Sequence, residues 1–166
     1  MDRVSKINYY LDIAEAVSER GTCLRRRYGA VIVNNDAIIS TGYVGAPRGR
    51  KNCCDLNSCI RIKLNVPRGT NYDICRSIHA ENNAVIQAGR DKCIGGTLYL
   101  VGIDIDTGKY TKNANCCTMC KRVIINAGIK EVIIRDSKTD YRIIDVEKEY
   151  VENDDSLNID PSKEGY

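Results

Sequence analysis

The chain has 166 residues, 43% of them apolar, and its 25 Lys and Arg against 22 Asp and Glu give a net charge of only +3. The length fits one domain with a buried core. The sequence contains no run of about 18 apolar residues, which is the length needed to span a membrane, and the modest net charge argues against a nucleic-acid partner. Residues 1–17 are charged and amphipathic, unlike a signal peptide, so the nine cysteines favour a reducing cytoplasm and metal sites over disulfides.

The first half of the chain predicts one helix, one hairpin and a long irregular segment. Apolar residues at helical spacing predict an amphipathic helix over residues 5–20 that ends near Gly21. Two apolar runs on either side of the turn-forming "NND" predict a β-hairpin over residues 30–43. Residues 44–74 carry glycine, proline, asparagine and three cysteines without a periodic apolar pattern, so we expect this segment to be irregular.

The second half alternates helices with strands. It predicts a helix over residues 79–88 that stops at Gly89, a strand over 97–102, a loop or small hairpin over 103–115, a helix from Cys117 to Gly128, and a strand over 131–135. From Asp145 onward the chain carries eight acids and two lysines, which predicts a domain over residues 1–150 and a flexible acidic tail over 151–166. This alternation indicates a layered α/β domain whose sheet opens with a hairpin and continues through crossovers.

Metal-ligating residues stand at the starts of two predicted helices. Cys117 and Cys120 form C-x-x-C, which places both sulfurs on one helical face, and the positive end of the helix dipole favours their thiolates. His79, the only histidine, begins the other helix and can supply a third ligand. Three protein ligands leave one tetrahedral position open, as in a catalytic zinc site, where zinc lowers the pKa of water to about 7.

Glu81 follows His79 by two residues and can move a proton as general base and then general acid. Taken alone, a His–Glu pair is usually an ordinary surface pair, and C-x-x-C is equally typical of half a structural zinc site or a redox pair. The combination of H-A-E at one helix start with C-x-x-C at another is the zinc-deaminase signature. We therefore predict a catalytic zinc.

Three segments carry a family resemblance: "RGTCLRRRYGAVIVNNDAIISTGYVGAPRG", "CRSIHAENNAVIQAG" and "CCTMCKRVIINAGIKEVII". Over about residues 4–135 the chain resembles the deoxycytidylate (dCMP) deaminase family of the cytidine deaminase superfamily. The resemblance implies a three-layer α/β/α fold around a five-stranded mixed sheet, and hydrolysis of dCMP to dUMP and ammonia, which supplies dUMP for thymidylate synthesis. It also implies homo-oligomers, often hexamers, with dCTP and dTTP as effectors. Matched by position, zinc is held by His79, Cys117 and Cys120, Glu81 moves protons, and the backbone at Ala80 approaches the pyrimidine.

The chain departs from the family pattern at three places. Val44 stands where the family has an asparagine associated with sugar and effector recognition, Cys116 replaces a proline and is interpreted as a neutral neighbour, and residues 103–115 lengthen one connection. Val44 therefore leaves open a deaminase of another cytosine nucleotide, nucleoside or modified base. A non-catalytic zinc-scaffolded module that binds nucleic acid is a further alternative, against which Glu81 argues because a structural site needs no proton carrier. The absence of Trp and Phe for base stacking also argues against a nucleic-acid substrate.

Charge and cysteine distribution give two further expectations. Residues 1–80 carry 13 Lys and Arg against 7 Asp and Glu, so either a solvated basic face or a 5′-phosphate site is expected there, with candidate residues Arg25, Arg26, Arg27, Arg48 and Arg50.

Related deaminases carry cysteines at similar positions, and some bind a second, structural zinc in this region. The resemblance thus implies such a site at Cys23, Cys54, Cys59 and Cys75, with Cys53 as an alternative ligand and buried, inert cysteines as the other interpretation; Cys93 is expected to serve packing.

Overall fold

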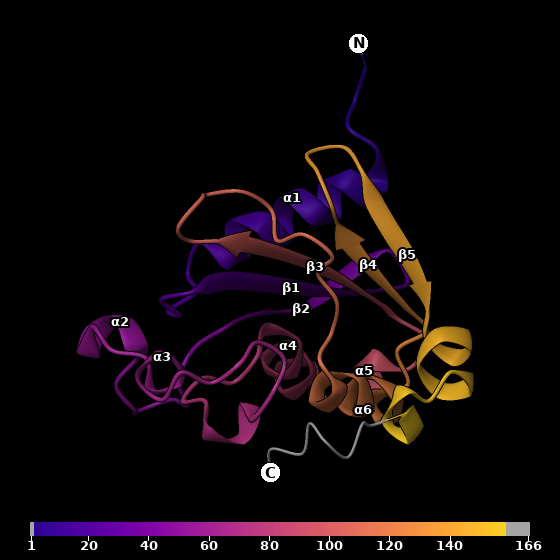
Figure 1. The fold of residues 1–166 in the computed structure, drawn as a ribbon. Coiled ribbons are helices and arrows are strands. Elements are labelled where there is room, and N and C mark those ends of the chain that lie inside the picture. The colour runs from indigo at the N-terminus through magenta and orange to yellow at the C-terminus, as the bar shows by residue number, and fades with distance from the viewer. Residues whose placement is uncertain (1, 159–166) are drawn as a thin grey trace.

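The computed structural model describes residues 2–158, in which five strands form one mixed sheet with helices on both faces (Figure 1). The strand order is β2-β1-β3-β4-β5; β3 and β4 run parallel and the other neighbouring pairs antiparallel. The strands are β1 (Arg26–Asn34), β2 (Ala37–Tyr43), β3 (Thr97–Asp104), β4 (Glu131–Arg135) and β5 (Tyr141–Asp145). This architecture confirms the predicted three-layer α/β/α fold with a five-stranded mixed sheet.

Helix α1 (Lys6–Ser18) forms one outer layer, as the apolar periodicity of residues 5–20 predicts. The Ser5 hydroxyl accepts a hydrogen bond from the backbone N–H of Asn8, which caps the helix, and the apolar face packs on β1 and β3. Gly29 of β1 lies directly under this helix, because a Cβ there would be 2.2 Å from the carbonyl oxygen of Ala14. The sheet and α1 therefore touch through backbone atoms.

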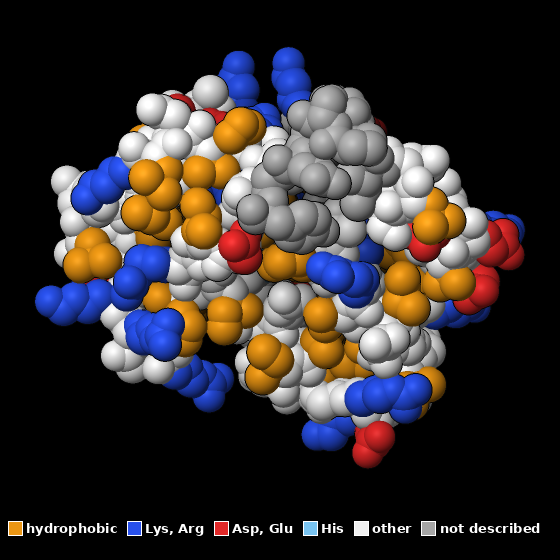
Figure 2. Space-filling view, turned by 60° about the horizontal axis from the view of Figure 1, so that its bottom comes forward, with side chains coloured by type: hydrophobic (Ala, Val, Ile, Leu, Met, Phe, Trp, Pro, Cys, Tyr) orange, Lys and Arg blue, Asp and Glu red, His pale blue; other side chains and the backbone are white. Residues whose placement is uncertain are grey.

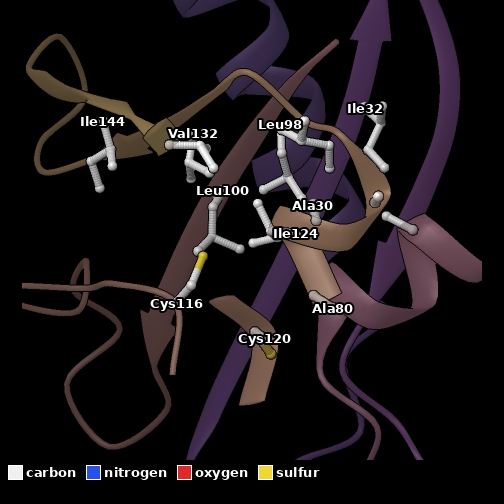
Figure 3. Close-up of a cluster of buried hydrophobic side chains, with 14 of the residues drawn as sticks. Ala30, Ile32, Ala80, Leu98, Leu100, Cys116, Cys120, Ile124, Val132 and Ile144 are labelled. Atoms are coloured by element: carbon white, nitrogen blue, oxygen red, sulfur yellow. The ribbon is translucent and has the colours of Figure 1, made fainter. Parts of the chain in front are cut away.

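Helices α4 (Ala80–Ala88), α5 (Arg90–Cys93) and α6 (Thr118–Ala127) cover the opposite face of the sheet (Figure 1). Their small and branched side chains meet those of β1, β3 and β4 in the larger core cluster (Figure 3). Gly42 of β2 has the same role here that Gly29 has on the other face: a Cβ would lie 2.3 Å from the carbonyl oxygen of Ala80 and 2.4 Å from the backbone nitrogen of Ala84. The backbone of α4 therefore rests on β2.

Residues 44–74 contain more structure than the sequence predicts. Within them lie the short helices α2 (Cys53–Leu56) and α3 (Ile60–Lys63) and the 3-10 turn η1 (Tyr72–Ile74), so the expectation of an irregular segment is wrong for these residues. The buried guanidinium of Arg61 donates to the carbonyl oxygens of Thr70, of Asn71 at 2.7 Å and of Pro67 at 3.1 Å, which ties the segment together. In Figure 2, Lys and Arg side chains alternate with apolar ones on the half that carries α2 and α3, whereas most acidic side chains in that view lie on the other half.

The C-terminal part contains β5, a π-helical turn η2 (Glu147–Glu152) and a 3-10 turn η3 (Asp155–Asn158). The predicted boundary between residues 150 and 151 falls inside η2. The rest of the predicted flexible tail, residues 159–166, lies outside the described residues, and the division into domain and tail stays a prediction. Between residues 2 and 158, no helix combines the length and the hydrophobicity needed to cross a bilayer.

Candidate active site

Three potential metal ligands meet between the starts of α4 and α6. His79 is the N-cap residue of α4 and Cys117 is the N-cap residue of α6, while Cys120 lies one turn further along α6. The Nδ1 atom of His79 lies 3.4 Å from Sγ of Cys117 and 3.3 Å from Sγ of Cys120. All three ligand atoms lie within 4.8 Å of one another, so the predicted cluster is assembled as the two motifs indicate.

This donor set fits a zinc ion. With Zn–N and Zn–S bonds of about 2.0–2.3 Å in a tetrahedral arrangement, a nitrogen and a sulfur ligand are separated by about 3.6 Å. The observed separations of 3.3 and 3.4 Å are close to that value without any side-chain rearrangement. An imidazole nitrogen with two thiol sulfurs is also a ligand set typical of zinc, and it leaves one coordination position for water or substrate.

The two thiols of this cluster differ in their affinity for protons. A hydrogen bond from Cys120, together with the neighbouring His79 imidazole, lowers the pKa of Cys117 to about 4 despite its partial burial. The adjacent Cys117 thiolate and burial raise the pKa of Cys120. One thiolate is therefore present at neutral pH, and metal binding would release the proton of the second thiol.

The carboxyl group of Glu81 lies in the first turn of α4 and is 4% exposed. Burial raises the pKa of this carboxyl above its usual range, and the charge of His79 opposes the shift only partly. A carboxyl group with a raised pKa holds a proton more readily than a free one, which suits a group that accepts a proton and later returns it. The side chain has the position and the chemistry of a proton carrier beside the metal ligands.

A cavity of about 130 Å³ opens over these residues, and its lining includes His79, Glu81 and Cys117. Two predicted substrate-binding residues, Ala80 and Val44, are buried and form part of its wall. Tyr72 from η1 also lines the cavity and meets the His79 ring edge-on, with 5.1 Å between the ring centroids. The cavity thus combines an apolar wall with a few polar groups, as small-molecule sites commonly do.

The structure separates the predicted phosphate-binding arginines. Arg25, which precedes β1, and Arg26, the first residue of that strand, both line the cavity. Arg27 follows Arg26 in the strand and does not line the cavity, because successive side chains of a strand point to opposite faces. Arg48 and Arg50 are exposed and lie outside the cavity lining, so the structure does not support their predicted role. Sequence reasoning missed two other arginines that line the cavity, Arg61 and Arg68, since both lie in the segment whose path depends on tertiary contacts.

Four cysteines line the cavity, and they differ from the predicted second set at one position. Cys23, Cys59 and Cys75 all line the cavity, but the fourth member is Cys53 and not Cys54. The Cys54 side chain is exposed, its thiol lies 3.8 Å from the carboxylate of Asp55, and it is not part of the cavity lining. Burial, followed by the nearby Cys59, Cys23 and Cys75, raises the pKa of Cys53.

Cys93 is a packing residue, as the sequence predicts, and Cys116 is a buried neighbour of the three potential ligands. Figure 3 shows the thiol of Cys116 directed at Leu100 in the core, and Cys116 is not among the three clustered ligands. Cys93 at the end of α5 is fully buried among apolar side chains. Neither residue belongs to a cluster of potential ligands among residues 2–158.

Comparison with known sequences places this geometry in a family context. Residues 4–135 match the sequence model described as "Cytidine and deoxycytidylate deaminase zinc-binding region". The chain is 35% identical over 135 residues to the deoxycytidylate deaminase of Schizosaccharomyces pombe, which covers 81% of this chain and 38% of that protein. It is 33% identical over 138 residues to that of Mycobacterium phage D29, covering 80% of this chain and 96% of that one. The chain thus spans about two fifths of the yeast relative and nearly all of the phage relative.

Solved structures give the same family and fold. The dCMP deaminase of cyanophage S-TIM5 is 26% identical with a TM-score of 0.54, over 81% of this chain and 85% of that chain. The cytidine deaminase of Burkholderia pseudomallei, at 17% identity and a TM-score of 0.55 over 87% of this chain and 95% of that chain, shares the fold.

Proposed function

Because the chain belongs to the cytidine and deoxycytidylate deaminase family, we propose that it hydrolyses dCMP to dUMP and ammonia. One observation carries the proposal: His79, Cys117 and Cys120 converge beside a cavity whose lining includes His79, Cys117 and the buried residue Glu81. The relatives from Schizosaccharomyces pombe and Mycobacterium phage D29 are named as deoxycytidylate deaminases. The product, dUMP, would be available for thymidylate synthesis.

The reaction adds water at C4 of the cytosine ring and breaks the bond between C4 and the exocyclic nitrogen. A zinc ion held by His79, Cys117 and Cys120 would supply the Lewis acidity that makes water a competent nucleophile near neutral pH. Glu81 accepts one proton from the attacking water and donates it to N3 of the ring; it then accepts the proton of the hydroxyl now on C4 and delivers it to the departing amino group, so that C4 keeps the oxygen and ammonia leaves. The buried Ala80 and Val44 exclude solvent around the base, so that these proton transfers occur in a site of low polarity.

The arginines that line the cavity predict a preference for the monophosphate over the nucleoside. Each charge-assisted contact to a phosphate is worth about 1.5–3 kcal/mol, so kcat/KM for dCMP should exceed that for deoxycytidine by at least about tenfold. Replacing Arg25 or Arg26 with glutamine should lower kcat/KM for dCMP about tenfold and change that for deoxycytidine much less. Ammonia release with both substrates measures the difference.

Arg48→Gln is the matched control for this prediction, because Arg48 has the same charge but lies outside the cavity lining. This variant should have the wild-type kcat/KM for both dCMP and deoxycytidine. Equal catalytic efficiency of the wild-type protein on dCMP and deoxycytidine would contradict a phosphate site. Activity on another cytosine compound but not on dCMP would point instead to the alternative specificity that Val44 leaves open.

We propose that Cys23, Cys53, Cys59 and Cys75 bind a second, structural zinc. Four cysteines from separate segments line the same cavity, and the backbone N–H of Arg25 donates to Sγ of Cys23 at 3.4 Å. Among residues 2–158 only His79, Cys117 and Cys120 already have their ligand atoms within 4.8 Å of one another, so a second zinc would draw these four thiols closer together. A closed set of four thiolates is typical of structural zinc, and such a site would join the strand β1 to the segment that carries α2 and α3. We expect two zinc ions per chain by elemental analysis of metal-replete protein.

Neighbouring cysteines provide a sharp control for the second zinc. Cys53→Ser and Cys59→Ser should lower the zinc content from two to one per chain, whereas Cys54→Ser should leave it at two, because Cys54 faces solvent. One zinc per chain in metal-replete wild-type protein, with these four thiols freely titratable, would contradict the proposal. The cysteines would then be packing residues.

The proposal also covers the oligomeric state of the protein, its effectors and its cellular location. Apolar side chains on α2 and α3 and directly after them, including Leu56, Ile62 and Leu64, are 42% to 60% exposed and offer a surface for a homo-oligomer. The predicted hexamer, the effectors dCTP and dTTP and the cytoplasmic location stay predictions.

A further inference from the structure

We propose that Asn115 presents its side-chain N–H groups to the substrate and that Tyr150, from the C-terminal segment, is the positioning residue that holds it in this orientation. The inference rests on the proposed deaminase function and adds a recognition residue to it. Asn115 lies at the rim of the cavity, two residues before the metal-ligand candidate Cys117. Its expected target is an oxygen acceptor of the nucleotide, either the ring carbonyl or the phosphate.

The orientation of the Asn115 amide is determined by two donors. The backbone N–H of Cys116 donates to Oδ1 at 2.8 Å, and the hydroxyl of Tyr150 donates to the same oxygen at 2.6 Å. A carbonyl oxygen has two lone pairs, so both acceptor positions of the amide are filled. The Nδ2 group has no hydrogen-bond partner within residues 2–158, which leaves two donors for a ligand.

A backbone N–H at position 116 makes this arrangement available. Position 116 is a cysteine, which has a backbone N–H to donate, whereas a proline there would have none. A neighbouring amide N–H can bond only to Oδ1 and not to Nδ2, so this contact excludes the flipped orientation of the amide.

Residues beyond the family match hold this part of the chain in place. Tyr150 is 6% exposed and belongs to the core cluster, and Lys121 of α6 lies over its ring at 5.0 Å. Arg142 of β5 donates to the carbonyl oxygen of Ala114 at 2.6 Å, directly before Asn115. Both anchors come from the chain after residue 135, where the family match ends, so the C-terminal segment contributes to substrate recognition.

Two substitutions at Asn115 separate the donor from the local structure. Asn115→Ala removes the amide, whereas Asn115→Asp keeps an acceptor for Cys116 and Tyr150 but has no N–H to offer. We expect both to weaken dUMP binding about five- to tenfold in calorimetric titration, and to raise KM for dCMP by a similar factor with kcat changed less than about twofold. Tyr150→Phe keeps the ring but loses the hydroxyl, and a smaller rise in Kd and KM, about threefold, is expected because Cys116 still holds one side of the amide.

Product ligands make the binding test independent of turnover. Asn115→Ala should weaken dUMP and deoxyuridine equally if the donor meets the ring carbonyl, and dUMP alone if it meets the phosphate. Lys112→Ala is the control, because Lys112 is exposed and lies in the same loop, residues 103–115, as Asn115. This variant should bind dUMP and deoxyuridine with wild-type affinity.

Wild-type affinity for dUMP and wild-type KM in both Asn115 variants would overturn the assignment. A Tyr150→Phe variant that is less stable but has unchanged Kd and KM would make Tyr150 structural and overturn its positioning role. A wild-type protein that binds dUMP but does not deaminate dCMP would refute the proposed function while leaving the Asn115 comparison intact. A wild-type protein that binds neither ligand would overturn both.

Discussion

Replacing Glu81 with glutamine should lower kcat for dCMP by about 10³-fold while the zinc content stays at the wild-type level. General acid–base catalysis by a positioned side chain contributes about 10² to 10⁴ in rate, and Glu81 would serve at more than one proton transfer. Glutamine has nearly the same size and can still form hydrogen bonds in the buried site, but it cannot exchange a proton. The measurements are steady-state kinetics and elemental analysis on the same preparation.

Stability provides an independent check on this variant. Burial raises the pKa of Glu81 in the folded state, so this carboxyl lowers the stability of the folded protein as pH rises above the pKa that Glu81 has in the unfolded chain. Removing this ionisable group should leave the melting temperature at neutral pH unchanged or slightly raised. Zinc loss in Glu81→Gln would make Glu81 a ligand, and an unchanged kcat would exclude it as the proton carrier.

Cys120→Ser should lose the catalytic zinc and reduce deamination to background. The Cys120 side chain is fully buried and faces His79 Nδ1 at 3.3 Å, so the serine hydroxyl would place a poor zinc ligand where a thiolate is required. Adding zinc to the metal-free wild-type protein should restore activity, whereas the same addition to Cys120→Ser should not. Metal content and ammonia release measure both effects.

Cys93→Ala is the matched control, because Cys93 is equally buried but lies in α5 away from the ligand cluster. It should cost about 1–2 kcal/mol of stability through the lost packing volume and retain zinc and activity. If Cys120→Ser kept stoichiometric zinc and measurable turnover, the assignment of Cys120 as a ligand would be wrong.

The parts of the fold with strong local patterns were predictable. Helices α1, α4 and α6 combine apolar residues at helical spacing with a polar or glycine boundary, and Gly89 and Gly128 end the latter two in positive-φ conformations that glycine adopts readily. The cluster of potential metal ligands was predictable for a related reason. His79 and Cys117 are both N-cap residues, so a motif at each helix start fixes where its ligand points.

Other features depend on contacts that no short stretch of sequence specifies. Helices α2 and α3 have four residues each, too few for a periodic pattern, and the segment after them is held by Arg61 through distant carbonyl groups. Strand β5 is short and pairs only with β4, and its residues show no clear alternation. Local sequence also could not choose between Cys53 and Cys54, because the helix that contains them determines which thiol faces the cavity.

Gly42 limits how this protein can change over evolutionary time. A methyl group at this position would be more than 1 Å too close to the backbone of α4, whose ordinary contact distance is about 3.5 Å, so the helix would have to lift from the sheet. His79 and Glu81 move with α4, whereas Cys117 and Cys120 belong to α6, and lifting one helix would pull the two halves of the cluster apart. Substitutions at Gly42 are therefore not neutral, although the residue takes no part in the chemistry. New specificities in this lineage should arise in the surrounding loops, whose residues can vary without changing the height of the helix.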